Sequence, residues 1–94
     1  MSISIARVPT RSASRYLQQL AKHWSHKMTV VFTEEEATID FPAGPRLMMR
    51  AAPETLDIEL TVPDDGDPAR MRQVVAEHLD RFAFREAPLT FDWH

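Results

Sequence analysis

Two of the four histidines in the chain, His23 and His26, lie three positions apart in the stretch AKHWSHKMTV. Imidazole nitrogens bind zinc and haem iron, and they exchange protons near neutral pH. At about 100° per residue of a helix, His23 falls on the flank of the apolar stripe and His26 points mainly to solvent. The pair is therefore either a metal or haem ligand pair or, with Lys22 and Lys27, the positively charged end of a helix, where cations complement the helix dipole.

His78 is the second residue that invites a chemical interpretation, because it falls in an apolar helical stripe where an aliphatic side chain is expected. A buried imidazole must find a hydrogen-bond partner or stay neutral. It is interpreted as a hydrogen-bonded core histidine, or alternatively as an axial ligand or a general base in a pocket. Glu86, beside Arg81 and Arg85, is either a salt-bridged corner or part of a polar site. With His23 or His78 as the base, Glu86 supports the hypothesis of a small enzyme.

Composition excludes several classes of protein. The chain has no cysteine, which excludes disulfides, thiol nucleophiles and cysteine-ligated metal clusters. Its two isolated glycines cannot build a dinucleotide-binding turn or a phosphate-binding loop. The N-terminus lacks the pattern of a signal peptide, and no apolar run is long enough to span a bilayer. We therefore expect a cytoplasmic protein with no membrane partner.

The charge and apolar patterns bear on macromolecular partners. The net charge is −3, with basic residues concentrated in 1–33 and acidic residues in 51–94, which indicates either an anion-binding face or an ordinary solvated surface. Nucleic-acid binding is not expected, since the chain is acidic and no strand carries spaced aromatic residues. The runs VVF and LMM place apolar residues on both faces of a strand. We therefore expect that a second copy of the chain covers the outer face of the sheet around Val31 and Met48. Alternatively, the chain is a monomer, and these residues are ordinary scattered apolar residues on its surface.

Hydrophobic periodicity predicts one domain over residues 1–94. The expected elements are a strand at 2–8, a helix at 13–25 capped by Thr10, strands at 28–32, 37–41, 46–51 and 55–62, a helix at 68–82 capped by Asp67, and a strand at 87–94. The order is β-α-β-β-β-β-α-β. In the strand at 55–62 every second residue is apolar, which indicates a sheet with one covered face. The predicted fold is an α+β two-layer sandwich with a curved antiparallel sheet and both helices on one face.

The stretches RSASRYLQQLAKHWSHK and HLDRFAFREAPLTFDW resemble the bacterial domain-of-unknown-function family 2218. The resemblance extends over nearly the whole chain, and the hairpin EEEATIDFPAG differs in having alanine where relatives often have glycine. The family has no established activity. Its relatives are associated with flavin-dependent siderophore-interacting reductases, which implies siderophore or iron handling and a flavin-dependent reductase as partner.

The resemblance also implies a set of site residues, if the two motifs mark a site. They are Arg15, Tyr16, His23, Trp24, His26 and Lys27 from the first helix, and Arg81, Phe84, Arg85, Glu86 and Trp93 from the C-terminal corner. A cationic, aromatic cleft between the helix ends suits an anionic aromatic ligand such as a catecholate. The first expectation is therefore a small binding or accessory domain without catalysis. The alternatives are a metal- or haem-binding protein using His23 and His26, and a small enzyme with a histidine base.

Overall fold

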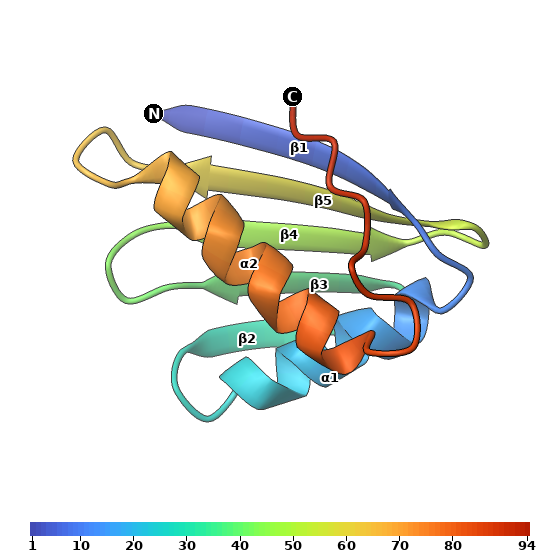
Figure 1. Ribbon diagram of the computed structural model, residues 1–94. Helices are drawn as coiled ribbons and strands as arrows, with labels where there is room; N and C mark the ends of the chain where they lie inside the picture. The colour runs from blue at the N-terminus through green and yellow to red at the C-terminus, as the bar shows by residue number, and fades with distance from the viewer.

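The computed structural model describes all of residues 1–94 and contains five strands and two helices (Figure 1). These are β1 (Ser2–Pro9), α1 (Ala13–Trp24), β2 (Thr29–Phe32), β3 (Glu36–Asp40), β4 (Arg46–Ala51), β5 (Thr55–Val62) and α2 (Pro68–Phe82). The strands form one antiparallel sheet in the order β1-β5-β4-β3-β2. Both helices lie on the same face of the sheet, which confirms the predicted α+β two-layer sandwich.

The core lies between the sheet and the helices. On β5, alternate residues from Leu56 to Val62 are buried, while the residues between them are only half-buried. Helix α1 contributes an apolar stripe that includes Leu17 and Leu20, and α2 contributes Val75 and Leu79. These side chains belong to one cluster of 20 buried residues. Neither helix has the length and apolar character that crossing a membrane requires.

The predicted start of α2 is confirmed, whereas the predicted cap of α1 is wrong. The Asp67 carboxylate accepts a hydrogen bond from the backbone N–H of Arg70 at 3.1 Å, as an N-cap residue does. Helix α1 begins at Ala13, so Thr10 lies too early in the chain to cap its first turn. The Thr10 hydroxyl accepts instead from the N–H of Ser12 at 3.1 Å.

The strand predicted over residues 87–94 is also wrong. This segment runs beside α2 on the helix face of the sheet and ends next to β1 (Figure 1). Its backbone pairs with the sheet at one position, where the N–H and C=O groups of His94 and Ile5 exchange hydrogen bonds of 2.8 and 3.2 Å. Leu89 is buried, and Phe91 and Trp93 pack against the core. The apolar alternation therefore comes from packing on the core and not from a strand ladder.

Candidate ligand-binding site

A cavity of about 270 Å³ lies between the first half of α1 and the end of α2. The residues that line it are Arg15, Tyr16, Gln19, Phe82, Phe84 and Arg85. The three from α1 share one side of the helix, since residues three and four positions apart are neighbours there. The other three come from the last residue of α2 and the turn that follows it. The cavity thus combines two guanidinium groups with three aromatic rings.

Both arginines of the cavity are free of acidic partners. Arg15 and Arg85 are exposed, and neither belongs to any of the ion pairs of the structure. The guanidinium carbon of Arg85 lies 5.7 Å from the ring centroid of Phe84, within the range of a cation–π contact. Guanidinium groups bind carboxylates through two parallel hydrogen bonds and also stack on aromatic faces. The cavity can therefore receive a group that is both negatively charged and flat.

Glu86 fastens the turn after α2 to the beginning of α1. The Tyr16 hydroxyl donates a hydrogen bond to Oε2 of Glu86. The Thr10 hydroxyl lies 3.1 and 3.0 Å from the two carboxylate oxygens and donates to them. Tyr16 and Thr10 are both buried, and Glu86 forms no ion pair with Arg81 or Arg85. The carboxylate is thus occupied by hydroxyl groups and leaves the cavity arginines unneutralised.

The same contact determines the protonation of Tyr16. The hydrogen bond to Glu86 is the main cause that raises the pKa of the Tyr16 hydroxyl above 10.0, and burial and the negative charge of Glu86 raise it further. The phenol is therefore a hydrogen-bond donor at neutral pH and not a base.

The imidazole rings of His23 and His78 meet beside the same helices, with their centroids 5.7 Å apart. His23 also lies 5.7 Å from the Phe82 ring, and His78 lies 4.9 Å from the Trp24 ring. Nδ1 of His78 is 2.7 Å from the carbonyl oxygen of Val74, which can only accept, so Nδ1 carries the proton. The predicted hydrogen bond of His78 is present, but the side chain is only half-buried and is not part of the core cluster, so the prediction of a core histidine is only half right.

The surroundings of His23 favour its neutral form. Burial is the main cause that lowers its pKa below 6.5, and the positive charges of His78, Lys27 and Arg81 lower it further. His26 is exposed. No group of three or more histidine, cysteine, aspartate or glutamate side chains is arranged to hold a metal ion. Metal or haem binding by His23 and His26 stays a prediction for which the structure offers no third protein ligand.

The site residues predicted from the sequence therefore lie in three places. One group lines or anchors the cavity: Arg15, Tyr16, Phe84, Arg85 and Glu86. A second group surrounds the imidazole rings: His23, Trp24, His26, Lys27 and Arg81. Trp93 belongs to neither, because its ring stacks on Phe91 with centroids 5.9 Å apart. Neither histidine ring is a hydrogen-bond partner of Glu86, which binds the hydroxyl groups.

Three residues of the site were not among those predicted: Thr10, Gln19 and Phe82. Gln19 could have been found, since it lies three and four positions after Tyr16 and Arg15. Phe82 is the last residue of α2, and it packs against the core as well as lining the cavity. The contact of Thr10 with Glu86 joins residues 76 positions apart, and no local pattern signals it.

The chain is similar to known bacterial proteins in sequence and in fold. Residues 5–94 match the family described as "Uncharacterized protein conserved in bacteria (DUF2218)". The fold is similar to that of PA4090 from Pseudomonas aeruginosa, solved by NMR, with a TM-score of 0.81 and 38% sequence identity. That match covers 100% of this chain and 96% of the other. No match is found among curated proteins.

Proposed function

The chain belongs to the bacterial family DUF2218, and we propose that it is a binding domain for a small anion that carries one aromatic ring. The observation that carries the proposal is the cavity between α1 and the turn after α2, where two arginines without acidic partners lie beside aromatic side chains. An anion gains charge-assisted hydrogen bonds there, and a flat ring gains stacking contacts.

The volume of the cavity limits the size of the ligand. Pockets for drug-sized molecules measure about 300–1,000 Å³. At about 270 Å³, this cavity has room for a single ring with a carboxylate. Phe84 is 72% exposed, which is unusual for a large aromatic side chain, and a bound ring would cover it. An aromatic carboxylate of the benzoate or dihydroxybenzoate type meets these conditions, and the amide of Gln19 can hydrogen bond to a ring hydroxyl.

The test is an amide chemical-shift titration with four compounds of similar size. Benzoate and 2,3-dihydroxybenzoate have the proposed charge and ring, cyclohexanecarboxylate keeps the charge without the aromatic ring, and benzylamine reverses the charge. We expect saturable shifts at residues 15–19 and 82–86 with both aromatic acids, weaker binding of cyclohexanecarboxylate, and no binding of benzylamine. Equal binding of all four, or no saturation at millimolar concentration, contradicts the proposal.

Variants assign the binding to the arginines. Arg85→Gln and Arg15→Gln each remove one charge, and each should raise Kd about tenfold, the usual effect of losing a hydrogen bond to a charged group. Arg81→Gln is the matched control, because Arg81 is exposed on α2 and does not line the cavity. An affinity that is unchanged in Arg85→Gln would place the ligand elsewhere.

The resemblance of the two motifs to the family suggests a more specific role for the domain, in siderophore or iron handling. Titration with the ferric complex of 2,3-dihydroxybenzoate tests it, since tighter binding of the complex than of the free acid supports a siderophore role. If only the free acid binds, the domain binds aromatic acids and the siderophore role is not supported. Zinc and haem titrations of the wild type and of His23→Ala test the second candidate in the same spectra.

A further inference from the structure

The face of the sheet opposite the helices, here called the open face, is not covered by any other part of the chain. The side chains that β1 directs to it alternate with the buried Ser4, Ala6 and Val8. Four large apolar residues are exposed on this face: Ile3, Ile5, Met48 and Val31, at 54%, 45%, 43% and 70%. Single exposed apolar residues are ordinary, but several on one sheet face are typical of an interaction surface.

Charged side chains form a regular row across the open face. The strand register places Arg7 beside Asp57, Asp57 beside Arg50, and Arg50 beside Glu36, from β1 through β5 and β4 to β3. The signs therefore alternate as plus, minus, plus, minus. Nη2 of Arg50 lies 2.6 Å from Oε1 of Glu36, and Nε of Arg7 lies 3.6 Å from Oδ1 of Asp57.

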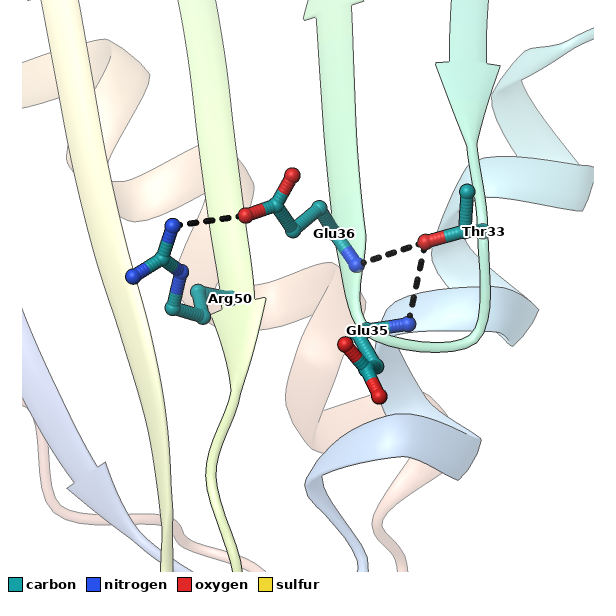
Figure 2. A network of polar contacts seen from close by, with 4 residues as sticks. All are labelled: Thr33, Glu35, Glu36 and Arg50. Carbon is teal, nitrogen blue, oxygen red and sulfur yellow. Dashed lines mark hydrogen bonds and ion pairs between the residues drawn. The ribbon is translucent and has the colours of Figure 1, made fainter.

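Local structure fixes the Glu36 end of the row. The Thr33 hydroxyl accepts hydrogen bonds of 3.1 Å from the backbone N–H groups of Glu35 and Glu36, which holds the turn between β2 and β3 (Figure 2). Figure 2 also shows the Arg50 and Glu36 side chains reaching toward each other across neighbouring strands.

The middle of the row is incomplete within one chain. Oδ1 of Asp57 is buried and has no hydrogen-bond partner; its ion pair is with Nε of Arg7 at 3.6 Å, and no ion pair joins Asp57 to Arg50, its neighbour on β4. The Asp57 side chain as a whole is 32% exposed, so its carboxylate can be reached from the open face. The contact with Arg7 is longer than a hydrogen bond, so the carboxylate is only weakly paired within the chain, and a cation from outside the chain can pair with its exposed part.

We propose that the open face binds a second copy of the chain, sheet against sheet, about a two-fold axis that runs along the strands between β5 and β4. This rotation reverses the order of the strands in the second copy. Arg7 then lies opposite Glu36 of the second copy, and Asp57 lies opposite its Arg50. Each of the four charges of this row then faces an opposite charge, which is the complementarity that selects a partner and fixes its register.

The charge pattern also selects the axis. A two-fold axis that crossed the strands along this row would place each residue opposite itself, so that Arg7 would face Arg7 and repel it. The apolar Ile5 and Met48 lie in the next row, where Ile5 is beside Glu59 and Glu59 is beside Met48 in the register. Packing of the two sheets therefore covers apolar area next to the paired charges.

The shape of the open face is suited to receive side chains. A hollow of about 520 Å³ lies over β1, β5, β4 and β3, and its lining includes Ile5, Met48 and the four residues of the charged row. Stable interfaces cover about 800 Å² on each partner. The chain has an accessible surface of 5847 Å², of which such an interface would cover about one seventh.

Sedimentation equilibrium of the wild type, Arg50→Glu, Asp57→Arg and an equimolar mixture of the two variants tests the proposal. The wild type should dimerise with rising concentration. Each variant alone places like charges opposite each other, so its dimer Kd should rise by about tenfold or more. The mixture should form a 1:1 heterodimer, because the Glu introduced at position 50 of one chain then faces the Arg introduced at position 57 of the other.

Matched controls carry the same charge reversals on the opposite side of the molecule. Arg70→Glu and Glu77→Arg alter exposed residues of α2 and should leave the dimer Kd unchanged. Circular dichroism confirms that each variant is folded. A wild type that stays monomeric at millimolar concentration overturns the proposal. So does a dimer that survives both single reversals, or a mixture of folded variants that does not associate.

Discussion

Tyr16 is the only tyrosine of the chain, so its titration reports directly on the contact with Glu86. The ultraviolet absorbance of the wild type should show a phenol that ionises above pH 10.0, because the hydrogen bond to Glu86 and burial raise its pKa. Since the folded pKa is higher than the unfolded one, the stability from this contact is complete below pH 10.0 and is lost as the pH rises through the folded pKa.

Glu86→Gln keeps an acceptor oxygen but removes the charge, so the pKa of Tyr16 should fall toward 10.0. Asp65→Asn removes a carboxylate from the exposed loop before α2 and serves as the control, with the titration unchanged. If Tyr16 titrates in the Glu86→Gln protein as it does in the wild type, the hydrogen bond between Tyr16 and Glu86 does not form in solution.

His23 gives a prediction at acidic pH. Burial lowers its pKa in the folded protein below 6.5, so the unfolded chain binds more protons between the two pKa values and stability rises with pH there. The contribution is complete above pH 6.5 and is lost as the pH falls through the folded pKa. Urea unfolding at about pH 7.5 and about pH 5 should show that the free energy of unfolding falls less between these pH values in His23→Gln than in the wild type. His94→Gln, at an exposed position that does not contribute to the lowered pKa of His23, is the control, and an equal loss of stability at acidic pH in all three proteins contradicts the prediction.

At the scale of elements, the C-terminal segment helps the two helices to cover one face of the sheet instead of adding a strand to it. Leu89 is buried in the core cluster, and its N–H donates to Oδ1 of Asp80 at 2.9 Å. Leu89→Ala should lower the free energy of unfolding by about 2–5 kcal/mol, as for other buried leucines. Thr90→Ala, at the exposed next position, should change it by less than about 0.5 kcal/mol. Equal effects of the two substitutions in urea unfolding would mean that the segment does not pack in solution.

The same segment shows how far the sequence predicts the elements. Alternation of apolar residues reports which side chains face the core, and this was correct for β5 and for residues 89–94 alike. It does not report whether a backbone has a neighbouring strand to pair with. β5 lies between β1 and β4, whereas the C-terminal segment meets β1 only at Ile5. Strand pairing is a long-range property, and a single sequence carries no local signal for it.

The candidate site was predictable only where its residues are close in sequence. Helical spacing brings Arg15 and Tyr16 together, and the motif around Arg85 and Glu86 marks the turn that faces them. The sequence could not separate this cavity from the imidazole rings of His23 and His78, because both features lie along the same pair of helices. Packing of the helices decides which side chains point to the cavity and which face each other.

At the scale of the whole molecule, the cavity and the open face lie on opposite sides of the sheet and share no residue. The two proposed binding events are therefore expected to be independent, because neither ligand touches what the other binds. The dimer Kd should change by less than about twofold when the cavity is saturated with 2,3-dihydroxybenzoate. Arg85→Gln should weaken only the binding of the acid, and Arg50→Glu should weaken only the dimer.

A larger change would point to a segment that connects the two sites, of which the C-terminal segment is one. It follows directly on the turn that carries Arg85 and Glu86, and it ends at His94, which is hydrogen bonded to Ile5 of β1. Ile5 in turn lines the hollow of the open face. Sedimentation of the wild type and of a chain lacking residues 92–94, each with and without the acid, separates the two cases. Coupling carried by this segment disappears in the shortened chain, whereas independent sites give the same dimer Kd with and without the acid in each of the two chains.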